Sequence, residues 1–535
     1  MSRFQAARNT IEALFDAPPR ADSAAGRELT ASSRRLILGL MVALVIYVIV
    51  RGLAAAATKP LWYDELITLA MSSQPSMRTV WAALARAVDG QPPGFHAVER
   101  VVSNLFHNKE IALRLPAILA FSCTLVCVFV FVKKRGGELI AFLCAFLLLS
   151  TILFERYAVE ARPYSMVVAC IAFALVCYQR LPSLFWTAML GISLALAQAL
   201  HYYAVFAFVP FGLAEAVVFL RTRRFRWRVW LALACGFIPL VLFWPLLAYF
   251  KAHQGAHYYG LATYVATSLP SSYGAFFLTD SAFGAAVFAL AVAGVIGSYL
   301  LLRPGAPSER KIRDASVVEG TLLLALVASP IITFILVKLM RGGMRDAYAL
   351  SATIGIAIAV GCALSFARPA VVALFAVFVF SSVGVREFIF WRANHSLQLV
   401  SPAASVEEFV RESGYSGLPV VVSSGFRYMP IAHYASPAFS KRLFCLVDEK
   451  KELQYQGTDT FDKLVVVLRD YTPLQVRDFS EFTAAHPVFL IFGEEPGDGN
   501  NWLPQHLSHV ASVRSVAVEP YRKLSLVTMT EAPSR

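Results

Sequence analysis

Long apolar segments separated by short polar loops fill most of this chain before residue 390. A helix needs about 17–25 mostly apolar residues to cross the hydrocarbon core of a bilayer, and about eleven segments meet or approach that length. We therefore predict an α-helical polytopic membrane protein with about eleven transmembrane helices. The expected spans are residues 36–57, 111–132, 139–154, 163–178, 184–200, 203–220, 229–250, 281–302, 316–338, 346–366 and 370–389.

Polar segments flank this apolar region, which we assign as a membrane unit at 36–390. Residues 1–35 are rich in alanine and arginine and should form a disordered cytoplasmic tail. Residues 391–535 form a polar segment that is long enough for an exported domain. In this segment β-rich runs alternate with helical patterns. The expected strands are 418–422, 464–468, 489–492 and 524–527, and the expected helices lie near 403–413 and 473–485. These patterns predict a C-terminal α/β domain with an accessory role.

The first outer loop, at 58–110, should be more than a linker. Its apolar and polar residues alternate with helical spacing at 66–71 and 79–88. In the second stretch, Trp81, Leu84 and Val88 would fall on one face, as a helix lying at the membrane interface requires. Such helices could form the wall of an active site at the membrane surface.

The distribution of charge predicts the orientation. The chain is 57% hydrophobic and 16% charged, which excludes an ordinary soluble protein, and its net charge is +13. Basic residues gather in alternate short loops at 133–135, 221–228 and 303–313, and the positive-inside rule assigns such loops to the cytoplasm. We expect a protein of the cell inner membrane with a cytoplasmic N-terminus and a periplasmic C-terminal domain. Membrane lipid accounts for the positive charge, so nucleic acid is not an expected partner.

An adjacent pair of acids follows the first span directly, in the sequence Trp-Tyr-Asp-Glu at 62–65. Carboxylates beside lipid are costly unless a water-filled cavity or a substrate accommodates them. A third acid precedes a stiff turn that contains two prolines. The pattern favours catalysis at the membrane surface, although a helix cap and an ordinary turn are the structural alternatives. The candidate catalytic residues are Asp64, Glu65 and Asp89, with Tyr63 and Gln91 as further site residues.

Aromatic and charged residues also gather at other outer helix ends, above all in the segment 155–164. Arginine presents a planar fork suited to phosphate, and tyrosine favours the headgroup level of a membrane. Interfacial salt bridges and ordinary lipid headgroups are the alternative partners. The candidates for binding a donor phosphate are Arg162, Lys338, Arg341, Arg345 and Tyr348. The other candidate site residues are Tyr157, Glu160, Tyr164, His201 and Tyr202.

Taken in order, these motifs resemble the GT-C glycosyltransferases. Within that superfamily, the chain looks most like the bacterial protein mannosyltransferase and aminoarabinose transferase-like membrane proteins. The resemblance covers residues 36–365. It is carried by Tyr-Asp-Glu at 63–65, Asp-Gly-Gln-Pro-Pro at 89–93, Ala-Leu-Arg-Leu-Pro at 112–116, Glu-Ala-Arg-Pro-Tyr at 160–164, His-Tyr at 201–202 and the segment 345–348.

The resemblance implies a GT-C-like fold and the transfer of a hexosyl or pentosyl group from a polyprenyl-phosphate sugar on the outer face. In the family the acidic pair lies at the catalytic centre, which maps to Asp64 and Glu65. The acceptor would be a glycolipid, a glycan or a protein, and a divalent metal ion is a candidate cofactor without assigned ligands. Where the family has a histidine before the two prolines, this chain has Gln91, and the family's Arg-Tyr pair is spread over 345–348.

The chemistry of such a donor agrees with the residues present. A polyprenyl phosphate leaves as a phosphate monoester with a second pKa near about 6, so it departs without a general acid. The reaction then requires one base for the acceptor hydroxyl and fixed cations on the phosphate. Asp64 would be the base, Arg162 and the later cations would bind the phosphate, and a single displacement would invert the anomeric carbon.

Two other functions are consistent with a polytopic chain. A transporter or flippase for lipid-linked sugars typically has a two-fold repeat and polar groups at the bilayer midplane. The chain has no internal repeat, and its charges gather at the outer ends of the expected spans. Glu215, inside the span at 203–220, is the one exception. A membrane-anchored assembly protein would instead work through residues 391–535.

Overall fold

The computed structural model describes residues 30–254, 257, 265–276, 310–340, 342–365, 367–415, 417–493, 502–520 and 522–530. They divide into two compact units. The first unit contains residues up to 55, 114–244 and 264–396, and the second contains 56–113, 245–263 and 397–535. The expected span at 281–302 lies outside the described residues, as do residues 1–29 of the tail expected to be disordered at 1–35. The disorder expected for residues 31–35 is wrong, because these residues form the first part of a helix, Ala31–Thr58.

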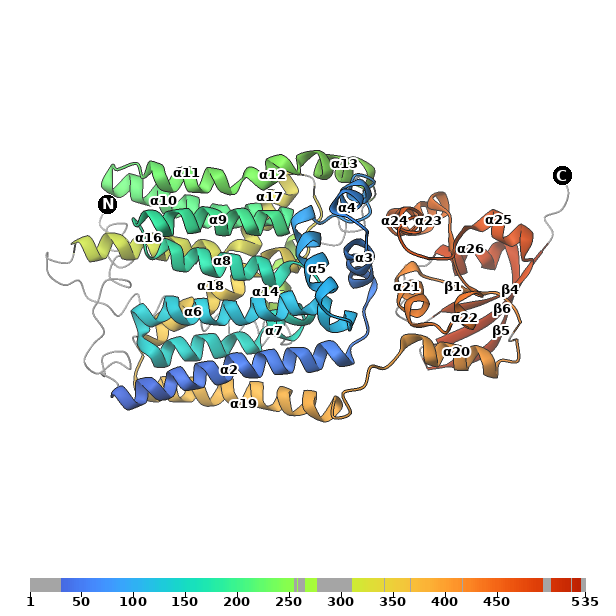
Figure 1. Ribbon diagram of the computed structural model, residues 1–535, viewed down its shortest axis with the longest axis horizontal. Helices are drawn as coiled ribbons and strands as arrows, with labels where there is room; N and C mark the ends of the chain where they lie inside the picture. Colours follow the sequence, from blue (N-terminus) through green and yellow to red (C-terminus); the bar gives the residue numbers. More distant parts are fainter. Residues whose placement is uncertain are drawn as a thin grey trace. The chain divides into compact units, whose positions relative to one another are not determined.

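The first unit is a bundle of helices that run side by side (Figure 1). Every expected span within the described residues overlaps one or more of these helices. The helices are α2 (Ala31–Thr58), α6 (Lys109–Leu147), α8 (Tyr164–Tyr178), α9 (Leu184–Leu200), α10 (Phe208–Thr222), α11 (Trp227–Gly236), α12 (Ile238–Leu242), α13 (Trp244–Gln254), α16 (Arg310–Val327), α17 (Ser329–Leu339), α18 (Ser351–Ser365) and α19 (Pro369–Ala393), of which α2, α6 and α13 run on into the second unit. The expected spans at 111–132 and 139–154 both overlap α6, whose backbone is non-helical at Gly137.

Short elements connect the long helices at their ends. They are η1 (Leu148–Ser150), α7 (Ile152–Glu155), η2 (Tyr157–Val159), η3 (Tyr202–Ala207), η5 (Ala266–Ser268), α14 (Leu269–Phe276) and η7 (Asp346–Ala349). The 3₁₀ turns η2, η3 and η7 contain several candidate site residues. Because a 3₁₀ turn is a tight connection between helices, side chains there can point toward a shared centre.

By length and composition, several of the described helices could cross a membrane, but these criteria do not fix the number of spans. Four are long and apolar enough to cross a bilayer alone, at Ala31–Thr58, Lys109–Lys134, Tyr202–Thr222 and Pro369–Ala393. Three further spans are pairs bent by 53–63°, and α8, α9 and α18 are shorter apolar helices. Pro245 and Pro330 lie at two of the bends, where a proline cannot continue the preceding hydrogen-bond ladder. The predicted number of about eleven spans stays a prediction.

A buried arginine joins three helices of the bundle. The side chain of Arg51 on α2 is 2% exposed and lies 2.9 Å from Glu155 on α7 and 3.3 Å from Glu387 on α19. Its guanidinium also stacks over the rings of Phe154 and Phe390, at 4.8 and 3.8 Å from their centroids. Helix α19 is only 17% buried over its apolar window, so this ion pair is an important part of its attachment to the bundle.

The second unit begins with three short helices formed by the first outer loop: α3 (Tyr63–Ser72), α4 (Met77–Leu84) and α5 (Pro93–Leu105). The helices expected at 66–71 and 79–88 are present as α3 and α4, although α4 ends at Leu84. The expected face of Trp81, Leu84 and Val88 is wrong. Trp81 is 41% exposed, whereas Val80 and Leu84 pack against Leu246. The early end of α4 places Val88 beyond the helix, so helical periodicity no longer relates it to Trp81.

The remainder of the second unit is an α/β domain with a six-stranded sheet of order β3-β2-β1-β4-β6-β5. Strands β1 to β4 are mutually parallel where they pair, and β6 is antiparallel to both β4 and β5. The strands are β1 (Val420–Val422), β2 (Leu443–Val447), β3 (Val476–Asp478), β4 (Val488–Gly493), β5 (Ala511–Glu519) and β6 (Arg522–Met529). The helices are α20 (Pro402–Glu412), α21 (Gly425–Tyr434), α22 (Pro437–Ser440), α23 (Glu449–Gln456), α24 (Thr460–Leu468), α25 (Phe479–Ala485) and α26 (Trp502–Val510).

Helices cover both faces of this sheet (Figure 1). Side chains alternate along a strand, so Phe489 and Ile491 face one side, where they pack with Trp502 of α26. Phe492 faces the other side and contacts Phe409 of α20 with ring centroids 6.4 Å apart. This double coverage explains why β1 and β4 are near-continuous apolar runs in the sequence.

Most expected elements of the domain are present, and one is wrong. Strands occur at 418–422, 489–492 and 524–527, a helix occurs near 403–413, and the helix expected at 473–485 is present only in its second half. Residues 464–468 form the end of helix α24 instead of a strand. The buried residues there are Asp462, Val465 and Leu468, which follow the helical period. The three consecutive valines favoured a strand, but tertiary burial overrode that local propensity.

Two carboxyl groups are buried beside one another in this domain. Glu452 is 1% exposed, and its carboxylate accepts the backbone N–H groups of Phe461 and Asp462 at 3.2 and 3.0 Å. Asp462 accepts the indole N–H of Trp502 at 3.1 Å. Burial, together with repulsion from Asp462, raises the pKa of Glu452 to about 8. Burial likewise raises the pKa of Asp462 to about 7. Both carboxyl groups therefore hold a proton more readily than ordinary carboxyl groups.

We expect replacement of Arg51 by methionine to destabilise the bundle strongly. The change leaves Glu155 and Glu387 without their shared cation, and breaking a buried ion pair costs about 3–5 kcal/mol. Thermal unfolding of the full chain in detergent measures the effect. Arg35→Met, at an exposed position on the same helix, is the matched control and should change the midpoint little. Equal midpoints for the two variants would contradict a structural role for Arg51.

We also expect the α/β domain to lose stability as the pH rises. A carboxyl group with a raised folded pKa binds its proton more tightly in the folded state. The stabilisation is complete below the unfolded pKa of about 4–4.5. It is then lost as the pH rises through the folded pKa of Glu452, about 8. Hydrogen exchange of the α24 amides between pH 5 and pH 9, corrected for intrinsic rates, measures this loss. Glu452→Gln should flatten the dependence, whereas the exposed Glu481→Gln should not.

Candidate active site

The acidic pair lies in the first turn of α3, and its two members differ in environment. Glu65 is fully buried, and its carboxylate accepts the backbone N–H of Trp62 at 3.2 Å. Asp64 is partly exposed, and its backbone carbonyl accepts the Thr68 hydroxyl at 3.1 Å. The helix dipole stabilises both carboxylates at this end of the helix. Glu65 therefore has a structural function at the start of α3, while the Asp64 side chain reaches the surface.

The third acid, Asp89, lies in the turn before α5. Asp89 and Gln91 are 8% and 7% exposed, and both are buried for polar side chains. The Asp89 carboxylate lies 3.4 Å from Nε2 of His96, which is fully buried on α5. Asp89 is therefore half of an Asp–His pair. The sequence reasoning did not identify His96, because a lone histidine inside an amphipathic stretch gives no distinctive pattern.

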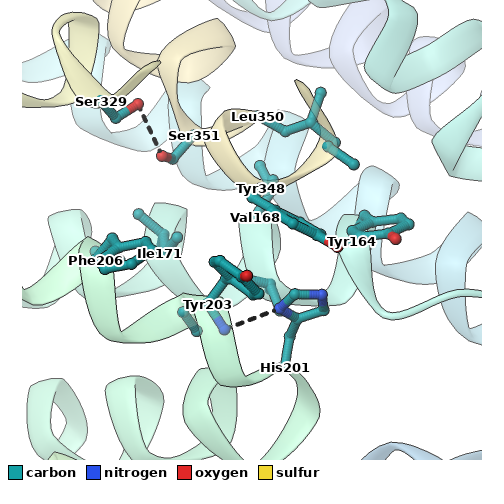
Figure 2. Close-up of a pocket in the computed structure, with 14 residues that line it drawn as sticks. Tyr164, Val168, Ile171, His201, Tyr203, Phe206, Ser329, Tyr348, Leu350 and Ser351 are labelled. Atoms are coloured by element: carbon teal, nitrogen blue, oxygen red, sulfur yellow. Dashed lines mark hydrogen bonds between the residues drawn. The ribbon is translucent and has the colours of Figure 1, made fainter. Parts of the chain in front are cut away.

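In the first unit, four aromatic rings from different elements meet (Figure 2). Tyr348 of η7 stacks on Tyr203 of η3 with centroids 4.0 Å apart and an angle of 17° between the rings. His201 lies 5.2 Å from Tyr348 and 5.5 Å from Tyr164, the first residue of α8. The structure thus brings together three residues that the sequence identified and adds Tyr203, which it did not.

These rings line a small cavity of about 30 Å³. A water molecule needs roughly 10–15 Å³ of such space, so the cavity has room for about two or three water molecules. Its lining also includes Ser329 and Ser351, whose hydroxyls lie 3.3 Å apart. Figure 2 shows the aromatic rings on one side of this cavity and the two serines farther away. The cavity therefore combines apolar walls with a few polar groups.

His201 has a defined tautomer in this arrangement. Its Nδ1 accepts the backbone N–H of Tyr203 at 3.1 Å and so caps η3. Because Nδ1 is an acceptor, the neutral ring has its hydrogen on Nε2. The Tyr203 hydroxyl in turn donates to the carbonyl of Gly343 at 2.7 Å, which ties η3 to the segment before η7. Tyr202, the next candidate, is buried at 7% exposure.

Charged residues lie close to the aromatic group. Tyr157 contacts Tyr164 edge to face, with centroids 5.1 Å apart. Arg345 is near enough to Tyr157 and Arg156 to act on both electrostatically. Arg156 pairs with the buried Glu160 at 3.3 Å, so Glu160 balances one of these cations.

The other phosphate-binding candidates differ in their placement. Arg162 is 6% exposed and lies at the start of α8, where Ser165 donates to the carbonyl of Tyr157 at 2.7 Å. Lys338 is exposed at the end of α17, and its ammonium lies 5.8 Å from the centroid of the Phe334 ring. Arg341 lies outside the described residues.

Glu215 has structural partners. Its carboxylate accepts the Tyr178 hydroxyl at 2.7 Å and the Arg226 Nε–H at 3.0 Å, while a second nitrogen of Arg226 forms an ion pair with it. A buried charge with this many partners needs no ligand to account for it. The exception noted from the sequence therefore gives no specific support to a transport path.

The described residues do not form a metal centre. No group of three or more His, Cys, Asp or Glu side chains among them could hold a metal ion. Glu65 already accepts a backbone N–H, and Asp89 is engaged with His96. The candidate divalent metal ion stays a prediction.

Comparison with known proteins identifies part of the chain. Residues 90–249 match the model of the dolichyl-phosphate-mannose-protein mannosyltransferase family. No curated protein sequence matches the chain. The matched segment contains Gln91, Glu160, Arg162, Tyr164 and His201, which are also residues of the motifs that carried the resemblance.

Solved structures also align with the chain. Cupriavidus metallidurans ArnT bound to undecaprenyl phosphate has 15% identity and a TM-score of 0.40, and the alignment covers 91% of this chain and 97% of ArnT. Archaeoglobus fulgidus oligosaccharyltransferase AglB, in complex with an inhibitory peptide and a dolichol-phosphate, has 10% identity and a TM-score of 0.44, with coverage of 92% and 74%. At these scores the likenesses carry no argument about the substrate.

The family match relates residues 90–249 of this chain to that mannosyltransferase family. The described residues are mostly helical, and several of the helices are long and apolar enough to cross a membrane.

Proposed function

We propose that this protein transfers a single sugar from a polyprenyl-phosphate donor to an acceptor hydroxyl. The observation that carries the proposal is the family match over residues 90–249, whose description names a dolichyl-phosphate sugar. The sugar is a hexosyl or pentosyl group. The acceptor is a hydroxyl of a glycolipid, a glycan or a protein.

Asp64 is the general base in this mechanism. Its carboxylate takes the proton of the acceptor hydroxyl as the oxygen attacks the anomeric carbon. The contrast with Glu65 supports the assignment, since Glu65 is buried and holds the start of α3. Asp64 therefore has the exposure that an acceptor requires, and Glu65 fixes the helix that presents it.

Cations of the bundle bind the donor phosphate and stabilise it as it leaves. The bond between the anomeric carbon and the phosphate oxygen breaks, and the polyprenyl phosphate departs with both electrons. Arg162 and Arg345 are the leading candidates, with Lys338 and Arg341 as further contributors. Arginine suits this role because its planar fork makes two parallel bonds to a phosphate. Because the displacement has one step, the sugar inverts at its anomeric carbon.

The aromatic group of Tyr164, His201, Tyr203 and Tyr348 orients the donor in this mechanism. Tyrosine and histidine sit comfortably at the headgroup level of a membrane, where apolar and polar parts of a donor meet. The Nε2–H of His201 is a donor suited to a phosphate or sugar oxygen. Tyr157 packs behind this group against Tyr164.

We further propose an inner-membrane location in which the N-terminus is cytoplasmic and the domain at 391–535 is periplasmic. The arginine-rich loop at 221–228 supports this orientation through the positive-inside rule. The acidic pair then lies on the periplasmic face. A lipid-linked donor that has been moved to the outer leaflet would be within reach there.

Replacement of Asp64 by asparagine should lower turnover by at least about a hundredfold, since general base catalysis contributes about 10²–10⁴-fold. The substitution preserves size and most hydrogen bonding, so folding and donor binding should survive. The assay is sugar transfer from a polyprenyl-phosphate donor in liposomes at saturating donor. Glu65→Gln is the control, because glutamine can still accept the Trp62 N–H. The loss of turnover in this variant should be smaller than in Asp64→Asn. Near-normal turnover for Asp64→Asn would exclude Asp64 as the base.

Replacement of Arg162 by alanine should weaken donor binding, because a charge-assisted hydrogen bond contributes about 1.5–3 kcal/mol. That range corresponds to a rise in the donor KM of roughly 10–150-fold. Arg162→Lys should restore only part of the affinity, since an ammonium lacks the fork geometry. An unchanged donor KM in the alanine variant would assign Arg162 to structure instead.

A further inference from the structure

The α/β domain contacts the backbone that leads into the acidic pair. The hydroxyl of Tyr434, at the end of α21, accepts the backbone N–H of Leu61 at 2.9 Å. The same hydroxyl donates to a carboxylate oxygen of Glu110 at 2.9 Å. One side chain of the domain therefore fixes the chain three residues before Asp64 and ties it to the start of α6.

A second contact involves Tyr63, the residue next to Asp64. Its ring is 3% exposed and packs against Phe426 of α21 with centroids 4.5 Å apart. Phe461 of α24 approaches the same ring edge-on at 6.4 Å and packs on Phe426 at 4.4 Å. Aromatic contacts of this kind contribute about 0.5–1.5 kcal/mol each beyond the burial of area, so they hold the ring in one orientation.

The far end of α3 is held as well. The amide of Gln74, which is 8% exposed, donates to the carbonyls of Ala70 and Tyr471 at 2.8 and 3.0 Å. Arg86 and Asp470 form an ion pair at 2.8 Å nearby, but both are about half exposed, so that pair contributes little. The domain thus contacts both ends of the helix that carries Asp64.

The domain also fixes its own side of this contact. Phe461 donates its backbone N–H to the buried carboxylate of Glu452 at 3.2 Å. The start of α24 is therefore bonded to α23, and the ring that faces Tyr63 projects from a constrained backbone. A rigid support of this kind matters because a displacement of about 1 Å can cost about a hundredfold in rate.

We propose that Tyr434, Phe426 and Phe461 are positioning residues for Asp64, which makes the exported domain a part of the catalytic unit. They act through Leu61 and Tyr63, whose placement sets the direction of the neighbouring Asp64 side chain. The inference rests on the proposed role of Asp64 as the base. Residues 391–535 would then contribute to the rate of sugar transfer by positioning Asp64, in place of the accessory role expected from the sequence.

The test compares two matched pairs of variants in the full-length protein. Tyr434→Phe removes one hydroxyl, and Tyr415→Phe removes a hydroxyl that contacts only Arg514 among the described partners. Phe426→Ala removes the ring beside Tyr63, and Phe444→Ala removes a ring that packs against Phe482 within the domain. Phe426→Leu also removes the ring but retains much of its apolar volume. This variant replaces Phe426→Ala in the test if the alanine variant does not fold.

Two readouts are measured for each variant. Hydrogen exchange should become faster at residues 61–66 in Tyr434→Phe and Phe426→Ala, and it should stay unchanged there in both controls. In the transfer assay, kcat should fall about tenfold or more, because a displaced base loses part of its contribution. The donor KM should remain unchanged. Faster exchange at 61–66 with an unchanged kcat would overturn the inference, and so would unchanged exchange.

Combination with Asp64→Asn separates this inference from the proposed function. If the positioning residues act through Asp64, Phe426→Ala should add little loss in the Asp64→Asn background. A full, additive loss there would overturn the inference while leaving Asp64 as the base. Near-normal turnover for Asp64→Asn alone would instead refute the proposed function, whatever Phe426→Ala does.

Discussion

An ionised side chain inside an apolar bundle is tolerated only when oppositely charged or polar partners lie against it, and this constraint governs much of the structure. Arg51 is enclosed by two carboxylates and two aromatic rings contributed by α7 and α19. Glu215 is enclosed by Arg226 and Tyr178. The desolvation of each charge is offset by direct contacts, so each network fixes the helices that supply its members.

The same constraint separates structural charges from candidate functional ones. Glu65 is buried with a backbone donor, whereas its neighbour Asp64 remains partly exposed at the start of the same helix. Arg156 has Glu160 as a partner, while Arg345 is placed to act on Tyr157 and Arg156 together.

The sequence predicted the elements whose signals are periodic or strongly apolar, including α2, α19 and the central strands β1 and β4. It also predicted three members of the aromatic group, because Tyr164, His201 and Tyr348 follow or precede apolar runs. It failed where a tertiary contact decided the outcome. Residues 464–468 became helical because one side of α24 is buried and because the first turn of that helix donates the N–H groups of Phe461 and Asp462 to Glu452. Tyr203 and Tyr434 were not among the expected site residues because their importance arises from partners distant in sequence, Tyr348 and Leu61. His96 was missed because a lone histidine in an amphipathic stretch gives no distinctive pattern, although its partner Asp89 is only seven residues away.

The ion pair between Arg51 and Glu387 joins residues that are 336 positions apart in the chain. Synthesis proceeds at about 5–20 residues per second, so the two residues emerge tens of seconds apart. During that interval the helix that carries Arg51 lacks one of its two anionic partners. The membrane bundle therefore reaches its final charge balance only when its last helix has been made, and a chain that stops before α19 would leave an incompletely neutralised cation in the lipid.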